Sequence, residues 1–297
     1  MKIGPDYKGE RLVFVLGCPR SGTTWVQRLL SCHPRVRTGQ ESNLFIDSIG
    51  LQLRRWRRGL SLKERSGVGL ACYFTEAEML ELLREFMLKL LQRMLESLKD
   101  GEIFVEKTPD HALYLAEIIE MLPASRIIHV IRDPRDVVAS LIAAARGWAS
   151  ESLWAPRSAR EGAKLWMKSV NTVRKTIKHT RSKQLLEVRY EDLYDSPVPT
   201  LRGIAEFVGL VWTEEEMREV VEANRFAPGG DRNQPAIPLS GQAALAFGPH
   251  VTDPEGFLRK GKPGSWKSDL SPVDKFWVWK LARECARENG YRIGWFR

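Results

Sequence analysis

A short apolar run leading into a glycine-spaced loop constrains this chain more than any other feature. The residues Leu12–Leu16 are all apolar and include two valines, which favours a short buried β-strand. The loop Gly17–Thr24 follows, and Thr24–Ser31 is expected to form a helix that ends before His33-Pro34. Backbone N–H groups of such a loop, with the N-terminus of the next helix, form a cradle for an anion. We therefore expect an α/β protein whose first strand-to-helix turn binds a phosphate group.

Strand and helix signals alternate along the rest of the chain. Further strands are expected at 103–105, 127–131 and 185–188, and helices at 75–98, 109–122, 135–145, 164–180, 200–208, 213–223 and 271–289. This alternation predicts one domain over residues 1–297, with a P-loop-like three-layer α/β fold and a central parallel sheet flanked by helices. Residues 224–266 show no period and are rich in glycine and proline, so we expect a lid or cover over the ligand.

Composition narrows the function classes without choosing among them. The 297 residues can bury a core that needs neither disulfides nor a metal. The net charge of +9 favours an anionic ligand, but it does not distinguish a phosphate from a nucleic acid. The four cysteines are scattered and are expected to be reduced thiols, so no metal site is predicted. No apolar stretch is long enough to span a membrane, and the first residues are polar, so we expect a cytoplasmic enzyme.

The phosphate loop differs from the nucleotide P-loop, G-x-x-x-x-G-K-[ST], at one position. Thr23 stands where the lysine would reach the β and γ phosphates, and Arg20 places a cation inside the loop instead. This arrangement suits one terminal phosphate better than a triphosphate. A P-loop kinase or NTPase is one alternative. A non-catalytic polyanion-binding protein is another, which explains the charge but not the ordered motifs described next.

The segment Pro19–Trp25 resembles the loop with which the sulfotransferase family holds the 5′-phosphate of its donor, 3′-phosphoadenosine 5′-phosphosulfate (PAPS). Cytosolic members carry lysine at the position of Arg20, whereas tyrosylprotein sulfotransferases carry arginine, as here. The resemblance implies that Arg20 stabilises the leaving phosphate and that Trp25 stacks on adenine. The remaining loop residues that it assigns to the donor are Ser21, Gly22, Thr23 and Thr24.

Three later segments resemble donor-binding segments of the same family, in the same order. Arg132 and Ser140 match the residues that bind the 3′-phosphate, and Tyr190 matches an adenine-side tyrosine. The run Arg259-Lys260-Gly261 matches residues that close over the 3′-phosphate. The resemblance covers most of the chain, from Leu12 to Lys267. It implies in-line transfer of a sulfuryl group from PAPS to a hydroxyl or amine of a small-molecule or glycan acceptor. The product PAP is released and no metal is required. No nucleic-acid partner is expected, and the oligomeric state, including a homodimer, is left open.

A hydroxyl or amine acceptor needs a general base, and the sequence offers two. Glu41 lies in a segment that resembles the base segment of heparan-sulfate sulfotransferases, although Asn43 replaces their histidine. His111 follows Lys107-Thr108, which resembles the Lys-Thr-His of cytosolic members, but Pro109 occupies the position of their histidine. Glu41 is favoured, with His111 as the alternative.

The other acceptor-side candidates are cations and tryptophans. Lys107 is expected to stabilise the sulfuryl oxygens, with an ion pair to Glu106 or Asp110 as the alternative. The basic run Arg54–Arg58 either receives an acidic acceptor or is a solvated face. Two tryptophans after the 3′-phosphate segment either line the mouth of the acceptor site or belong to the core: Trp148 and Trp154.

Overall fold

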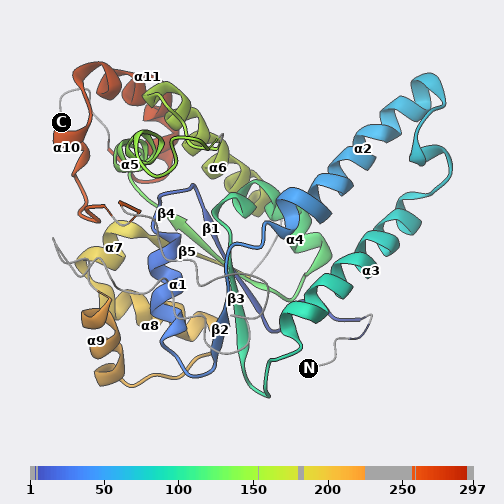
Figure 1. Ribbon diagram of the computed structural model, residues 1–297, viewed down its shortest axis with the longest axis horizontal. Coiled ribbons are helices and arrows are strands. Elements are labelled where there is room, and N and C mark those ends of the chain that lie inside the picture. Colours follow the sequence, from blue (N-terminus) through green and yellow to red (C-terminus); the bar gives the residue numbers. More distant parts are fainter. Residues whose placement is uncertain are drawn as a thin grey trace.

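A single sheet of five parallel strands forms the centre of the protein, in the order β2-β3-β1-β4-β5 (Figure 1). The computed structural model describes residues 4, 6–152, 154–179, 184–224, 256–257 and 259–292. The strands are β1 (Leu12–Gly17), β2 (Val36–Thr38), β3 (Ile103–Lys107), β4 (Arg126–Ile131) and β5 (Leu185–Arg189). Because β1 lies between β3 and β4, with Val15 beside both Lys107 and Ile128, the first loop opens at the middle of the sheet edge.

Helices connect the strands and cover both faces of the sheet. They are α1 (Thr23–Ser31), α2 (Ile49–Ser66), α3 (Glu76–Leu95), α4 (Leu115–Met121), α5 (Pro134–Arg146), α6 (Ala159–His179), α7 (Tyr190–Asp195), α8 (Pro197–Val208), α9 (Glu214–Ala223), α10 (Trp266–Asp269) and α11 (Pro272–Glu288). Shorter π- and 3₁₀-helical turns are η1 (Leu44–Ser48), η2 (Leu70–Cys72) and η3 (Pro109–Tyr114).

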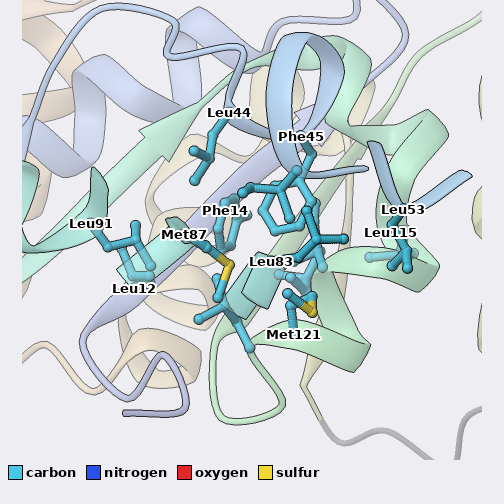
Figure 2. Close-up of a cluster of buried hydrophobic side chains, with 14 of the residues drawn as sticks. Leu12, Phe14, Leu44, Phe45, Leu53, Leu83, Met87, Leu91, Leu115 and Met121 are labelled. Carbon is cyan, nitrogen blue, oxygen red and sulfur yellow. The ribbon is translucent and has the colours of Figure 1, made fainter. Parts of the chain in front are cut away.

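The alternation of side chains along β1 separates two apolar cores. Phe14 faces a core built with η1, α2, α3 and α4 (Figure 2), whereas Val13 and Val15 face a core built with α1, α8 and α9. A third core joins α5, α6, α10 and α11. The predicted three-layer α/β fold with a parallel sheet is therefore confirmed.

The basic run Arg54–Arg58 lies on α2, a helix that was not predicted from the sequence. Leu53 and Trp56 are buried at helical spacing, but the surrounding arginines obscure that pattern. Figure 1 shows α2 and α3 extending away from the sheet as a helical hairpin. Arg54 pairs with Glu117 of α4, and Arg57 lies 2.6 Å from Glu120 of the same helix. These two arginines therefore pair α2 with α4, and the binding of an acidic acceptor by the basic run stays a prediction.

Two further differences concern the connections. The three-residue strand β2 was not predicted, because so short a run carries no usable period. The helix expected at 109–122 is a 3₁₀ turn followed by α4. Most of the expected cover, 224–266, lies outside the described residues, so the lid remains a prediction. Over the described ranges, no helix combines the length and apolar character needed to cross a membrane.

Candidate active site

The carboxyl edge of the sheet collects the residues singled out from the sequence. The phosphate loop follows β1, and Lys107 is the last residue of β3. Arg132 follows the last residue of β4, and Tyr190 follows the last residue of β5. Ligands of open α/β sheets bind at this edge, where the strand order reverses. Parallel pairing is the reason that segments distant in sequence meet here.

Close contacts require both glycines of the phosphate loop. A Cβ at Gly17 would lie 2.3 Å from the backbone oxygen of Val130, on the neighbouring strand. Gly22 has a φ of +102°, and a Cβ there would lie 2.4 Å from the ring of Tyr190. Gly22 is also the N-cap of α1 and has no side chain to bond the first amides of the helix. Those amides face the loop and suit an anion.

Arg20 connects the two segments assigned to the two ends of the donor. Its backbone has a φ of +73°, which is uncommon for a residue with a side chain. Its Nε donates to Ser140 Oγ of α5 at 3.1 Å, and its guanidinium lies 4.8 Å from the ring centroid of Phe257. Trp148 lies beside Phe257, with ring centroids 5.1 Å apart. Arg20 therefore links the phosphate loop to the middle of α5 and to an aromatic wall.

Tyr190 is the buried centre of the adenine-side segment. Its ring lies 5.5 Å from that of Trp25, and the guanidinium of Arg132 lies 4.0 Å from its centroid. Burial is the main cause that raises the pKa of Tyr190 to about 12, so its hydroxyl keeps its proton and donates to the backbone oxygen of Gly261. Trp25 is itself buried, so it supports Tyr190 from the interior.

Asp136, which we did not single out from the sequence, binds residues 264–266, which lie shortly after the run Arg259-Lys260-Gly261. This buried carboxylate accepts from the backbone N–H of Gly264 at 2.7 Å and of Trp266 at 3.0 Å. Ser265 Oγ lies 3.2 Å away as a third donor. Asp136 stands one residue after Arg135, in the run that resembles the 3′-phosphate segment. In the sequence, an aspartate at the start of a helix indicates only a helix cap, so it did not reveal these long-range contacts.

The two cations of the run Arg259-Lys260-Gly261 form ion pairs with the same carboxylate. Arg259 pairs with Asp269, and Lys260 Nζ lies 2.6 Å from the other oxygen of Asp269. The Nε atoms of Arg259 and Arg132 and the Oγ of Ser21 are buried without a hydrogen-bond partner among the described residues. All three belong to segments assigned to the donor, and each can bond a phosphate oxygen.

Lys107 and Glu41 form an ion pair on the acceptor side. The Nζ of Lys107 donates to Oε1 of Glu41, so neither predicted alternative partner of the lysine is the one it contacts. Lys107 is buried and Glu41 is exposed. The other oxygen of Glu41 has no partner among the described residues, so it can accept a proton from a bound molecule.

His111, the alternative base, is fully buried and uses both ring nitrogens. Its Nδ1 lies 2.9 Å from Oε2 of Glu106, and its Nε2 accepts from the backbone N–H of Phe45 at 3.2 Å. Burial raises the pKa of Glu106, but His111 and the hydroxyls of Thr108 and Ser42 outweigh it and hold that pKa at about 2. The ionised carboxylate only accepts, so Nδ1 carries the proton, and no ring lone pair of His111 faces a ligand.

Asp110 adds an acidic group beside the same site. Burial, followed by the charge of Glu41, raises the pKa of its carboxyl to about 6. Burial and Asp110 also raise the pKa of Cys18 in the phosphate loop, which keeps that thiol protonated. Among the described residues, no three His, Cys, Asp or Glu side chains gather as metal ligands.

A parallel sheet with a lysine-free loop after β1 and cations gathered at its carboxyl edge defines a P-loop-like protein. The family model described as "Sulfotransferase family" matches residues 13–214, and the chain belongs to this family. A protein-tyrosine sulfotransferase of Drosophila melanogaster is 26% identical over 77% of this chain and 42% of its own length. A putative one of Caenorhabditis briggsae is 27% identical over 69% of this chain and 68% of its own length. The chain thus spans less than half of the first of these relatives.

Solved structures share the fold at low sequence identity. A mouse sulfotransferase complexed with PAP aligns over 95% of this chain and 86% of its own, with a TM-score of 0.61 and 16% identity. The sulfotransferase domain of a Synechococcus olefin synthase aligns over 96% of this chain and 98% of its own, with a TM-score of 0.56 and 20% identity.

Proposed function

We propose that the protein transfers a sulfuryl group from PAPS to a hydroxyl acceptor and releases PAP. The observation that carries this proposal is the hydrogen bond from Arg20 to Ser140. It joins the 5′-phosphate loop to the segment assigned to the 3′-phosphate, so one ligand with two separated phosphates can contact both. The mouse structure with PAP and the protein-tyrosine sulfotransferases are additional support.

The chain's own residues supply the charges that the donor needs. The amides of the phosphate loop and Ser21 take the 5′-phosphate, while Arg132, Ser140 and the Arg259–Gly261 segment take the 3′-phosphate. Adenine would pack in the region of Trp25 and Tyr190. These arginines and lysines can neutralise the phosphates, so the proposed reaction needs no metal ion.

Side chains at the carboxyl edge of the sheet can supply the base and the charges that the transfer needs. The acceptor oxygen gives its proton to the Glu41 oxygen that does not face Lys107 and forms a bond to sulfur, while the bond from sulfur to the bridging phosphate oxygen breaks. Lys107 lies beside Glu41, where it can stabilise the sulfuryl oxygens, and Arg20 stabilises the charge that develops on the leaving phosphate. In-line transfer of this kind depends mainly on alignment and on fixed charges.

The acceptor class extends beyond the small molecules and glycans predicted from the sequence. The relatives' names include a protein tyrosine as an acceptor, so a polypeptide belongs to the proposal. Trp148 and Trp154 pack with ring centroids 5.6 Å apart, and Trp154 is exposed, which places an aromatic wall beside Arg20. This wall suits a phenolic acceptor. A cytoplasmic location stays a prediction.

A thermal-shift comparison tests the donor. PAP is expected to raise the melting temperature in the presence of EDTA, because both phosphates meet protein cations and amides. Mg-ATP is expected to give a smaller shift, because Thr23 replaces the lysine of an NTPase. A shift with Mg-ATP and none with PAP would show a kinase or NTPase instead, and equal shifts with any polyanion would show a binding protein.

A further inference from the structure

The segment that carries Glu41 has no regular structure of its own. It connects the end of β2 at Thr38 to η1 at Leu44, and residues 39–43 form neither helix nor strand. Asn43 has a φ of +51°, which turns the chain sharply after Glu41. A base in such a segment needs an external anchor, because a misplacement of about 1 Å at a reacting group can cost about 10²-fold in rate.

The anchor comes from one buried carboxylate at the end of β3. Oε1 of Glu106 accepts from the backbone N–H of Ser42 at 3.2 Å and from its hydroxyl at 2.7 Å. The same oxygen accepts from Thr108 Oγ1 at 2.6 Å, and Oε2 faces Nδ1 of His111 at 2.9 Å. Glu106 thus holds Ser42, the residue that follows Glu41, and also bonds Thr108 and His111, which lie just after β3.

The network extends past Ser42 on both sides of the turn. Thr108 Oγ1 lies 3.4 Å from the backbone nitrogen of Asn43, and His111 Nε2 accepts from the backbone N–H of Phe45. Lys107, next to Glu106 in sequence, pairs with Glu41. Two neighbouring residues of β3 therefore hold the Glu41 segment. Lys107 pairs with the carboxylate of Glu41, and Glu106 bonds the backbone N–H and the hydroxyl of Ser42.

We propose that Glu106 is a positioning residue for the general base, acting through Ser42 to hold Glu41 beside Lys107. This inference rests on the proposed function, because it assigns Glu106 to the base of that reaction. His111 shares the task by orienting the Glu106 carboxylate, which explains why a histidine beside the site is fully buried.

The experiment compares two acceptors in wild type, Glu41→Gln and Glu106→Gln. A tyrosine ester has a phenol with an ordinary pKa of about 10 and needs a base. The second acceptor, 4-nitrophenol, is assayed above its own pKa, where it is already ionised. We expect Glu106→Gln to lower kcat with the tyrosine ester by about 10- to 100-fold. With nitrophenolate the loss is expected to stay below about threefold, and the KM for PAPS to stay unchanged.

Glu102→Gln is the matched control. Glu102 is a buried carboxylate directly before β3, where it pairs with Arg37 and accepts from the backbone N–H of Lys99, at the end of the strand away from the site. Its loss is expected to lower stability without changing the ratio of the two acceptor rates. An equal loss with both acceptors in Glu106→Gln would overturn the positioning role and leave a structural one.

A second variant covers the case in which Glu106→Gln does not fold. Ser42 is exposed, so Ser42→Ala removes one hydroxyl from the network and leaves the core intact. We expect a loss of about threefold with the tyrosine ester and none with nitrophenolate. Unchanged rates with both acceptors would overturn the inference. If wild type shows no PAPS-dependent turnover of either acceptor, the proposed function itself fails, whatever the variants do.

Discussion

Replacement of Gly22 by alanine tests whether the phosphate loop and the adenine-side segment form one packed unit. The new Cβ would lie 2.4 Å from Cδ2 and 2.7 Å from Cε2 of Tyr190. The Tyr190 ring cannot retreat, because it is 1% exposed and lies between Trp25 and Arg132. Its hydroxyl is also bonded to the backbone of Gly261.

The expected cost combines backbone strain with overpacking. A residue with a side chain at this positive φ costs about 1–3 kcal/mol, and forcing extra volume into a packed site costs a similar amount. Alanine also restricts the unfolded chain more than glycine does, which offsets less than about 1 kcal/mol of this loss in stability. We therefore expect Gly22→Ala to lower the free energy of unfolding by about 1–6 kcal/mol and to weaken PAP binding.

Urea unfolding followed by circular dichroism, with a PAP titration by calorimetry, measures both effects. Gly203→Ala in α8 is the matched control, because a Cβ there meets no atom of the described residues within 4 Å and should add about 0.5–1 kcal/mol. A Gly22→Ala protein within about 1 kcal/mol of wild type, with an unchanged Kd for PAP, would refute the reasoning.

Three further predictions concern charged residues. Arg20→Ala is expected to lower kcat by an amount that corresponds to about 2–4 kcal/mol in the barrier to transfer, whereas Arg132→Ala is expected mainly to weaken PAP binding. Steady-state kinetics gives kcat and calorimetry gives the Kd for PAP. Equal and small effects of the two substitutions would contradict both roles. Asp136→Asn, which disturbs three hydrogen bonds to 264–266, is expected to cost about 2–4 kcal/mol of unfolding free energy and to weaken PAP binding; an unchanged urea midpoint contradicts this.

The pKa of Asp110 is raised from 3.8 to about 6, so the folded state binds more protons between those values and stability falls as pH rises through that window. Asp110→Asn is therefore expected to be more stable than wild type by up to about 3 kcal/mol at pH 7, and this gain is expected to disappear toward pH 4; a gain that is the same at both pH values contradicts this.

Local signals were enough to predict the framework of the molecule. The apolar run before the loop became β1, and the predicted helix starts at Thr75 and Ser271 are capping boxes in the structure. Asp133 likewise caps α5. These features depend on residues within a few positions of one another, so periodicity and capping chemistry reveal them. Four of the five strands were predicted this way, and β2, with three residues, was not.

The positions of the donor-side residues could also be named from the sequence, because they lie at strand ends and in spaced motifs. Their contacts could not. Arg20 meets Ser140 because β1 and β4 are neighbours in the sheet, a pairing that neither segment encodes by itself. The same holds for Asp136, whose partners Gly264 and Trp266 lie far along the chain.

The acceptor side shows the difference most clearly. From the sequence, Glu41 and His111 were both candidate bases, because either residue type can take a proton. Their surroundings in the folded chain distinguish them: His111 is buried with both nitrogens bonded, whereas Glu41 is exposed and one of its oxygens meets no partner among the described residues. The pairing of β2 with β3 brings the Glu41 segment to the end of β3, beside Glu106. Residue type and spacing thus revealed the candidate groups of this site, because both can be read locally. Long-range strand pairing sets which partners each group meets, as the burial of His111 and the exposure of Glu41 show.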